Sequence, residues 1–361
     1  MSKRLLVDIS AHGFGHAVQT CVVLNRLARL HPDVELVITS AVPHSFLAAR
    51  LQHPFDYHPR SSDFGMHMVS ALHVDRRSSF QAYRRLHRRW HQKVDEYAEH
   101  LGAISPTLIL SNIAYLPLAA AQRLNLPAVA LSCLNWADIF RHYFHDHPEA
   151  QHIFRQIRDA YRSADQFLLA TPYMPLSWMM PLTIVGPIAE PGSSRRADID
   201  DLLNLPKNVR LVTVGLGGID TSPPVRYLAT DPGIIWLVPR QWGLRQSNVI
   251  DLEALPYSFR DLTASSDLVV TKPGYGSFVE LACLGKPVLY LERPDWPESK
   301  YLIEWFGRHT RCNAITAPAL SRPGIAQQIE HLLALPPAPR PRPWGNDQAA
   351  HYLSRRLTLP T

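Results

Sequence analysis

The sequence predicts an α/β protein with two Rossmann-like domains, each a parallel sheet covered by helices on both faces. Three observations predict this fold class. A strand–helix–strand unit opens the chain, the alternation of short apolar strands with helices restarts after a proline-rich stretch near the middle, and a glycine-rich turn follows the first strand of each half. The length of 361 residues also suits two domains of ordinary size.

The N-terminal domain is expected over residues 1–185. Its first strand, over 4–9, leads through a glycine-rich turn into a helix from about 17 to 30, whose apolar residues recur at helical spacing. A second strand over 34–39 completes a βαβ unit. Further runs predict strands over 107–111 and 127–132 and helices over 78–103, 117–124 and 148–163.

A proline-rich, irregular stretch over 172–191 and the run Gly192–Arg196 predict a linker between the domains. The C-terminal domain is expected over 186–340. Five short apolar runs predict its strands, over 210–214, 234–238, 248–252, 267–271 and 287–291. The last segment, 341–361, follows an extended polyproline-type stretch and is expected to form a short helix from about 346 to 357.

The composition is that of a globular, core-forming protein, with 46% hydrophobic and 19% charged residues. The four cysteines are far apart and form no CxxC pair, so neither a zinc site nor a disulfide framework is expected. No apolar run approaches the ~20 residues of a membrane-spanning helix, and the first apolar stretch is too short for a signal peptide. We therefore expect a cytoplasmic protein.

The net charge of +6 favours anionic partners. Four arginines concentrate this charge, because Arg84 and Arg88, like Arg85 and Arg89, are spaced i,i+4 and would share one face of a helix. That face is either simply solvated or a docking surface for an anionic acceptor or the inner face of a membrane. Nucleic acid is not expected as a partner.

The turn after the first strand carries two histidines, His12 and His16, around Gly13 and Gly15. It lacks the GxGxxG order, so a dinucleotide fingerprint is weak here. Both histidines follow the carboxyl end of a strand, where open α/β sheets bind ligands. An imidazole can accept a proton from a hydroxyl near neutral pH, so His16 is the candidate catalytic base. The alternative is that these side chains only cap the turn.

A second constellation follows the predicted strand over 267–271. Gly274 and Gly276 allow close approach of a ligand to the backbone, and Ser277 lies near the start of a predicted helix, whose N–H groups favour phosphate. Glu280 lies one helical turn further on, where a carboxylate can accept both ribose hydroxyls. The alternative is that Glu280 only complements the helix dipole.

At this point the sequence resembles a known family. The stretch Lys272–Glu280, followed by Ala282 and Gly285–Pro287, looks like the nucleotide-sugar motif of GT-B glycosyltransferases. The resemblance is closer to the glycosyltransferase-like N-terminal part of L-arabinokinases than to the N-acetylglucosaminyltransferase of peptidoglycan lipid-precursor synthesis. Four segments support it and span most of the chain: 12–17, 63–75, 135–140 and 272–276.

The resemblance implies a GT-B fold, in which two Rossmann-like domains face each other across a cleft and the last helix crosses back to the N-terminal domain. It assigns Glu280 to the ribose of a uridine-type nucleotide and His16 to the neighbourhood of the acceptor hydroxyl. The residues assigned to the donor diphosphate are Gly217, Gly218, Lys272, Gly274, Gly276 and Ser277.

Other site residues follow with less support from the motif. The two glutamines that the peptidoglycan enzyme places near the donor sugar are not evident here, and Arg293, Asp295 and Glu298 stand in that region, unless they form an ordinary surface loop. Acceptor-side candidates lie in the N-terminal domain, at His12, Gly13, Gly15, Asp63 and Asp138.

No metal site is expected. Asp198-Ile199-Asp200 matches the Asp-x-Asp pattern with which GT-A transferases hold a cation, but it lies in the linker before a short helix, where acidic residues complement the dipole. GT-B folds usually neutralise the leaving diphosphate with helix dipoles and basic side chains. His142, His145 and His147 lack a familiar ligand spacing.

The sequence thus predicts a metal-independent glycosyltransferase that uses no cofactor and moves a sugar from a nucleotide-sugar, with UDP as the expected nucleotide, to an acceptor it does not identify. A single displacement would invert the anomeric centre. Two alternatives stay open: a non-catalytic GT-B-like module that senses a nucleotide-sugar, and an epimerase that acts on one.

Overall fold

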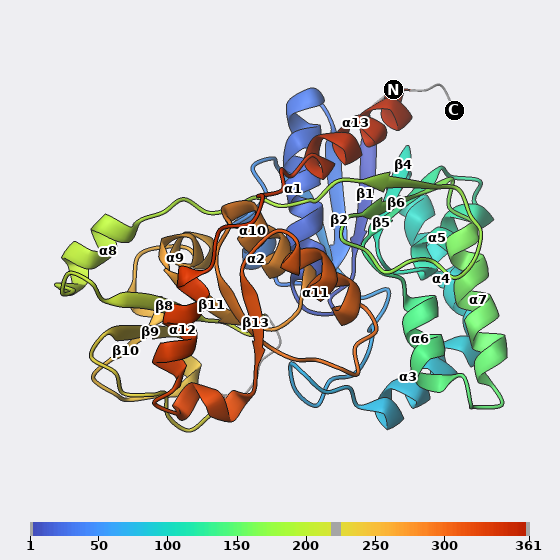
Figure 1. The fold of residues 1–361 in the computed structure, drawn as a ribbon. Coiled ribbons are helices and arrows are strands. Elements are labelled where there is room, and N and C mark those ends of the chain that lie inside the picture. The colour runs from blue at the N-terminus through green and yellow to red at the C-terminus, as the bar shows by residue number, and fades with distance from the viewer. Residues whose placement is uncertain (1–2, 218–224, 359–361) are drawn as a thin grey trace. The chain divides into compact units, whose positions relative to one another are not determined.

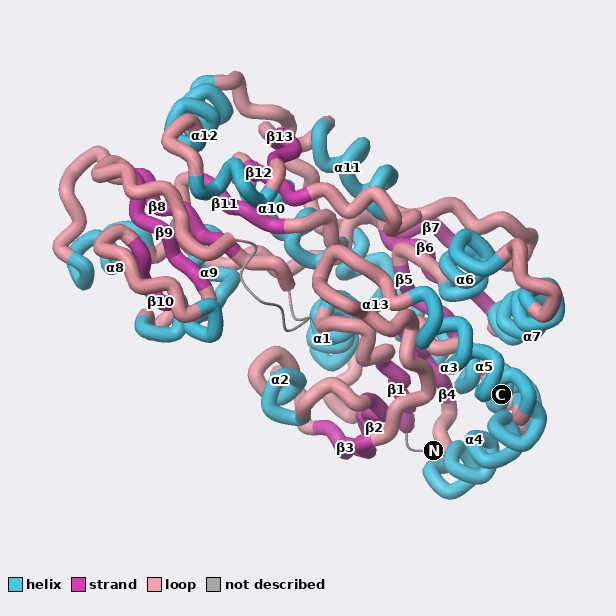
Figure 2. The backbone as a smooth tube through the Cα atoms, turned by 90° about the horizontal axis from the view of Figure 1, so that it is seen from below, coloured by secondary structure: helices cyan, strands magenta, loops and turns pink. Residues whose placement is uncertain are grey.

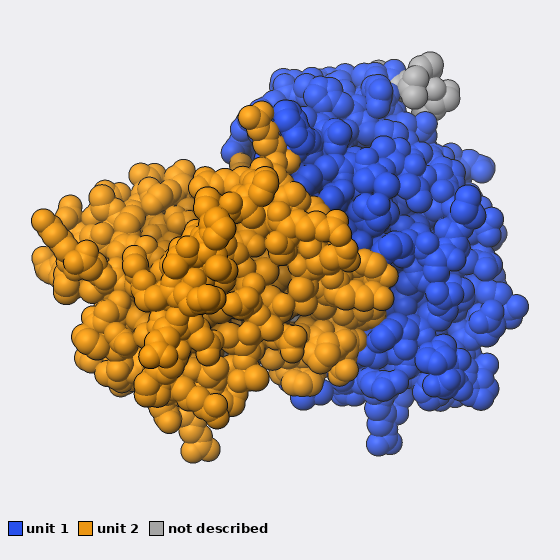
Figure 3. Space-filling model, in the orientation of Figure 1, with its two compact units in different colours: residues 1–69, 74–189, 343–361 blue, residues 70–73, 190–342 orange. Residues whose placement is uncertain are grey.

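The computed structural model describes residues 3–217 and 225–358, so Gly218 lies outside the described part of the chain. Two compact units make up the protein (Figure 3). Unit 1 comprises residues 1–69, 74–189 and 343–361, and unit 2 comprises residues 70–73 and 190–342. The final segment of the chain therefore belongs to the same unit as the first.

Unit 1 is built on a seven-stranded parallel sheet of order β3-β2-β1-β4-β5-β6-β7 (Figure 1). Its strands are β1 (Arg4–Ile9), β2 (Glu35–Ser40), β3 (Phe55–Pro59), β4 (Leu108–Asn112), β5 (Ala128–Ser132), β6 (Gln166–Ala170) and β7 (Leu182–Val185). Its helices are α1 (Gly15–Leu30), α2 (His44–Ala48), α3 (Arg76–Arg88), α4 (Trp90–Ile104), α5 (Leu116–Arg123), α6 (Trp136–Phe144), α7 (Ala150–Arg162) and α13 (Gly345–Thr358).

Unit 2 is built on a six-stranded parallel sheet of order β10-β9-β8-β11-β12-β13. Its strands are β8 (Arg210–Val214), β9 (Ile234–Val238), β10 (Val249–Asp251), β11 (Leu268–Thr271), β12 (Val288–Leu291) and β13 (Cys312–Ile315). Its helices are α8 (Arg196–Leu203), α9 (Phe259–Ser265), α10 (Tyr275–Leu284), α11 (Ser299–Gly307) and α12 (Ile325–Ala334), with short 3₁₀ turns at Arg240–Trp242, Leu252–Ala254 and Ala317–Ser321.

Helices cover both faces of the unit 2 sheet. Alternate strand residues point to opposite faces, and they divide between two apolar clusters. Val212 packs in one cluster with Ile325 and Ile329 of α12. Leu211 packs in the other with Ile199 of α8. Figure 2 shows α12 and α8 on opposite sides of the sheet. This two-sided burial explains why the strands read as continuous apolar runs.

Both sheets reverse their strand order at one point, in unit 1 between β1 and β4 and in unit 2 between β8 and β11. At such a point, the loops that follow the two neighbouring strands run to opposite faces of the sheet. A crevice therefore opens at the carboxyl ends of these strands. The predicted His12–His16 turn follows β1, and the predicted Lys272–Ser277 turn follows β11. The fold thus places each predicted turn at a ligand-binding position of its own sheet.

The structure corrects several local predictions. The predicted single helix over 78–103 is two helices, because the backbone at Arg89 leaves the helical region, with φ −113° and ψ 25°. The proline-rich stretch predicted to be irregular contains β7, and the predicted linker gives way to α8 at Arg196. Strands β3, β6 and β13 were not predicted: β3 and β13 lie at sheet edges, and β3 is largely polar.

The last helix packs on the first. In α13 the small and apolar side chains Ala349, Leu353 and Leu357 are buried, and the helix lies against α1, as Figures 1 and 2 both show. Asn346 fixes its start, because its amide group accepts from Ala189 N at 3.0 Å and donates to Ala189 O at 2.8 Å.

Candidate functional site

In unit 1 the two residues at the sheet's reversal point form a hydrogen-bonded pair. His16 is the second residue of α1 and Asn112 is the last residue of β4. His16 Nδ1 lies 2.9 Å from Asn112 Oδ1. The Asn112 amide nitrogen donates to Thr20 Oγ1 at 2.9 Å and to Gln19 Oε1 at 2.8 Å, which turns its oxygen toward the imidazole. His16 Nδ1 therefore carries the proton, and Nε2 keeps the lone pair.

The His16 imidazole is neutral over the physiological range. Burial lowers its pKa to about 4, and the hydrogen bond with Asn112 opposes that effect only in part. A neutral imidazole with a defined tautomer can accept a proton at Nε2. The arrangement therefore has the chemistry of a general base.

Trp136 joins both histidines to Asp63. Its indole Nε1 donates to Asp63 Oδ2 at 2.7 Å, and Ser10 Oγ donates to the other carboxylate oxygen at 2.9 Å. The indole ring lies edge-on to His12, with centroids 5.1 Å apart, and 6.0 Å from the ring of His16. Asp63 thus fixes the orientation of the Trp136 indole, which contacts the rings of both histidines.

Gly65 allows the backbone to approach the rings of His12 and Trp136 closely. Its φ is +59°, and a Cβ placed there would lie 2.7 Å from both the His12 ring and the Trp136 ring. The residue therefore has two independent reasons to be glycine, the left-handed backbone and the close approach of two rings. Tyr83 holds the same segment by donating to Gly65 O at 2.9 Å.

Asp8, which the sequence analysis missed, pins the neighbouring loop to the sheet. It is fully buried in β1 and accepts hydrogen bonds from the hydroxyls of Ser62 and Tyr97. Burial raises the pKa of Asp8 to about 7 and that of Asp63 to about 6. The only sequence signal was an acidic residue inside an apolar strand, which is unusual unless it is paired.

The remaining acceptor-side candidates, Gly13, Gly15 and Asp138, have structural roles in unit 1. Gly13 supplies a left-handed turn residue with φ +72°, and Gly15 begins α1 with open space around its Cα. Asp138 is the third residue of α6. Its carboxylate accepts from Ser177 N at 3.1 Å and pairs with Arg141, so it holds the start of α6.

In unit 2, the strand order reverses between β8 and β11, and Lys272 lies there between the turns at Gly217 and Gly274. Gly217 follows β8 with φ +88°, and Gly274 is the residue before α10. A Cβ at either glycine would lie 3.7 Å from Lys272 Nζ. Among residues 3–217 and 225–358, Lys272 Nζ has no hydrogen-bond or ion-pair partner. The amine therefore stands at the N-terminus of α10, the end at which a helix favours anions.

A second cation lies close to this amine. Arg293 is buried, with its guanidinium 4.0 Å above the ring of Trp296, whose Nε1 donates to Glu298 at 3.0 Å. Burial and the Arg293 charge lower the pKa of Lys272 to about 8, against the opposing effect of Glu298. Glu298 offsets part of this positive charge, and the N-terminus of a helix favours an anion.

The remaining donor-side candidates follow along α10 and the next loop. Gly276 and Ser277 are its second and third residues, and Glu280 lies one turn further on, half-buried. Of the predicted donor-sugar residues, Arg293 and Glu298 are buried near Lys272, whereas Asp295 is exposed. The structure therefore brings Lys272, Gly274, Gly276, Ser277, Arg293 and Glu298 to one end of the unit 2 sheet.

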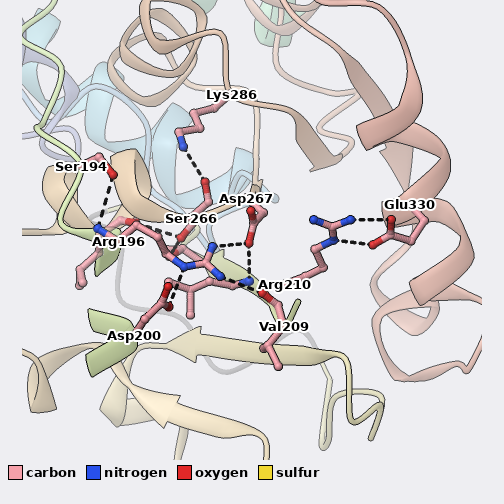
Figure 4. A network of polar contacts seen from close by, with 12 residues as sticks. Ser194, Arg196, Asp200, Val209, Arg210, Ser266, Asp267, Lys286 and Glu330 are labelled. Atoms are coloured by element: carbon pink, nitrogen blue, oxygen red, sulfur yellow. Dashed lines mark hydrogen bonds and ion pairs between the residues drawn. The ribbon is translucent and has the colours of Figure 1, made fainter. Parts of the chain in front are cut away.

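The Asp-x-Asp sequence belongs to a structural ion network. Asp198 lies in the first turn of α8, and Asp200 accepts from Arg196 Nε at 2.7 Å. Arg196 also donates to Asp267 at 2.6 Å, and this network lies before β11 rather than at its carboxyl end (Figure 4). In the described part of the chain, no group of three or more His, Cys, Asp or Glu side chains could hold a metal ion.

The prediction of one four-arginine face is wrong. Arg89 lies beyond the end of α3 and donates to Gln92 at 3.0 Å, because the helix breaks there. Arg84 is paired with Glu149 at 2.6 Å. Arg85 and Arg88 remain exposed in the last turn of α3. Across the residues that the structure describes, none of the helices is both long and apolar enough to span a membrane.

Comparisons with known proteins agree with this architecture. The L-arabinokinase of Arabidopsis thaliana is 24% identical over 307 residues, which are 81% of this chain and 28% of that protein. The chain thus spans little more than a quarter of that relative.

Solved structures show the same fold over the full length. The calicheamicin glycosyltransferase CalG4 superposes with a TM-score of 0.63 at 16% identity, covering 99% of this chain and 94% of that one. A UDP-glucosyltransferase from Polygonum tinctorium superposes with a TM-score of 0.59 at 12% identity, covering 100% and 99%. The fold is GT-B. A family model described as Glycosyl transferase family 1 matches residues 3–192, more than half of the chain. The chain therefore belongs to glycosyl transferase family 1.

Proposed function

We propose that this glycosyltransferase takes its sugar from a uridine diphosphate sugar bound by unit 2 and passes it to a hydroxyl group bound by unit 1. The observation that carries the proposal is the position of Lys272, whose Nζ lies 3.7 Å from where a Cβ would stand at Gly217 and at Gly274, the residue before α10. Such a site favours a diphosphate over a neutral ligand. The similar structure from Polygonum tinctorium is described as a UDP-glucosyltransferase, which supports the choice of nucleotide.

In this proposal the donor lies along the start of α10. The diphosphate accepts hydrogen bonds from Lys272 and from backbone N–H groups at the start of α10, and the Ser277 hydroxyl adds a further donor. Glu280 accepts the ribose hydroxyls. With a pKa of about 8, Lys272 is largely protonated at pH 7 and stabilises the leaving diphosphate, so the reaction needs no metal ion.

His16 is the proposed base. Its Nε2 removes the proton from the acceptor hydroxyl, while Asn112 keeps the other ring nitrogen protonated. The acceptor oxygen attacks the anomeric carbon, the bond from that carbon to the diphosphate breaks, and UDP leaves with the electron pair. One displacement of this kind inverts the anomeric centre.

UDP release tests the proposal. The protein is incubated with UDP-glucose, UDP-galactose or UDP-N-acetylglucosamine and a mixture of monosaccharide and phenolic acceptors. We expect acceptor-dependent release of UDP from at least one donor, with His16→Ala at least ~100-fold slower, the lower range for loss of a general base. Full turnover by His16→Ala would remove the assignment of the base.

The same assay separates the alternatives. A nucleotide-sugar sensor would bind UDP but release none from any donor with any acceptor. An epimerase would convert one UDP-sugar into another without an acceptor and would exchange a sugar hydrogen with solvent. Either result contradicts the proposed transfer.

A further inference from the structure

Strand β7 leaves one edge of the unit 1 sheet open. It pairs with β6 in parallel, with Leu168 opposite Thr183, and it is the last strand of the sheet. Phe167 N donates to Pro181 O and Thr171 N to Val185 O, so residues 181, 183 and 185 direct their backbone groups toward β6. Leu182 and Ile184 therefore direct theirs outward, where no strand of the described chain pairs with them.

This edge lacks the features that normally protect sheet edges. Strand β3, at the other edge of the same sheet, carries Asp56, His58 and Pro59. In unit 2, β10 has only three residues and ends at Asp251, which pairs with two arginines, and β13 begins with the small or polar residues Cys-Asn-Ala. Among the described edge strands, β7 carries the most large aliphatic residues, in the sequence Leu-Thr-Ile-Val, against two in the shorter Val-Ile-Asp of β10.

Large apolar side chains gather at the same place. Ile184 is 52% exposed and Trp344, just before α13, is 58% exposed. Leu182 and Met179 are exposed beside them in sequence. A groove of about 610 Å³ runs between β7 and α13 and is lined by Ile184 and Val185 on one side and by Trp344 and Tyr352 on the other. An exposed apolar edge next to a groove is typical of an interaction surface.

The helix beside the groove is rigidly held and self-complementary in charge. Gly186 N donates to Gln348 Oε1 at 2.7 Å, and a Cβ at Gly345 would lie 2.0 Å from Gly186 O, so the start of α13 touches the end of β7. Along its exposed side, α13 carries Arg355 and, two turns earlier, Asp347, which stays 54% exposed although its carboxylate lies 3.6 Å from Arg26 of α1. Two such helices running antiparallel would place each acid opposite the other's base.

We propose that β7 is the interface of a homodimer, in which a second copy of this chain adds its own β7 antiparallel at the open edge. A two-fold axis through Thr183 pairs Leu182 of one copy with Ile184 of the other, so the outward backbone groups hydrogen-bond across the interface. The two α13 helices then lie on the same face, Asp347 faces the partner's Arg355, and Trp344 fills apolar space at the groove.

The oligomeric state tests this interface. Size-exclusion chromatography with light scattering on the full chain, at about 50 μM, should give twice the mass of one chain. Ile184→Asp places a charge at the paired edge and should halve that mass. Leu202→Asp is the matched control, because Leu202 is equally exposed, at 53%, but lies on α8 in unit 2, and it should stay dimeric. A monomeric wild type, or an Ile184→Asp dimer, overturns the proposal.

A cross-link tests the register and does not depend on how Ile184→Asp folds. On the proposed axis, Thr183 faces its own copy in a non-hydrogen-bonded pair, with Cα atoms ~4.5 Å apart, which lies within the range of a disulfide. Oxidation of Thr183→Cys should convert the chain to a covalent dimer, whereas Leu202→Cys and the wild type should stay as single chains on a non-reducing gel. Failure of Thr183→Cys to cross-link overturns the proposed pairing.

Discussion

At the scale of single residues, the contact between His16 and Asn112 sets the proton chemistry of unit 1. An amide oxygen orients the imidazole without adding charge, so burial dominates and the pKa of His16 falls to about 4. A carboxylate in the same position would favour the imidazolium form. The identity of residue 112 should therefore determine the pH range over which the proposed base, His16, is neutral.

Replacing Asn112 by aspartate tests this dependence. In the wild type, the pKa of His16 is about 4, so protonation of His16 should not lower kcat/KM between pH 5.5 and 7. Asn112→Asp should raise the pKa of His16 and move the acidic limb of the profile to higher pH, because the new carboxylate stabilises the protonated ring. Thr20→Val, which removes one partner of the Asn112 amide, should leave the limb near its original pH. Identical profiles for wild type and Asn112→Asp would exclude His16 as the titrating base.

Asp8 makes a testable contribution to stability. Its pKa is about 7 in the folded protein and near 3.8 when exposed, so the folded state holds a proton that the unfolded state has lost between these values. The stabilisation from Asp8 is therefore full below about pH 4 and is lost as the pH rises toward 7.

Asp8→Asn removes this dependence, since an amide does not titrate. The difference in the free energy of unfolding, variant minus wild type, should become more favourable to the variant from pH 5 to pH 8, as measured by urea denaturation. His16 and His87, whose pKa values are lowered to about 4, act in the opposite direction in both proteins and cancel in the comparison. A difference that does not change with pH would show that Asp8 is ionised throughout.

Sequence reasoning proposed site residues that follow a glycine-rich turn, such as His16 and Lys272, because the turn marks the end of a strand. It missed Asn112 and Trp136. Asn112 ends β4 immediately beyond the predicted strand over 107–111, and its position there was the available signal. Trp136 could not be assigned, because its contact with Asp63 spans 73 residues and depends on tertiary packing.

At the scale of elements, the strands buried on both faces were predictable from their apolar runs, and strands β8 and β9 have the predicted bounds. Edge strand β3 was not, because its alternating polar residues give no continuous run. The break between α3 and α4 was also hidden, since arginines at 84, 85, 88 and 89 fit a helical face equally well whether or not the helix continues.

Two glycines in different elements should respond oppositely to alanine. Gly65→Ala should destabilise the protein by at least ~2 kcal/mol, because the left-handed backbone alone costs ~1–2 kcal/mol and the new methyl group would clash with two rings. Gly102→Ala should stabilise it by up to ~1 kcal/mol, because Gly102 lies inside α4 with open space around it. Urea denaturation of both variants measures the difference, and a neutral Gly65→Ala would contradict the close packing of His12 and Trp136.

At the scale of the whole molecule, donor binding and proton removal are assigned to different units. The residues proposed to bind the donor, from Gly217 to Glu298, all belong to unit 2, and the proposed base with its supporting residues belongs to unit 1. Sequence reasoning predicted this two-domain α/β organisation from the restart of the strand–helix alternation. It could not predict that residues 70–73 join unit 2, where Ala71 is buried in the apolar core.

Titration calorimetry with UDP tests the central claim, that the start of α10 binds a nucleoside diphosphate. We predict that wild type and His16→Ala bind UDP with the same affinity, whereas Lys272→Met binds at least ~10-fold more weakly, because it loses a charge-assisted contact of ~1.5–3 kcal/mol. Lys207→Met, an exposed lysine before β8 at the other end of the strand, is the control and should bind normally. Equal UDP affinity for Lys272→Met and wild type, or no binding of UDP by the wild type, would contradict the account.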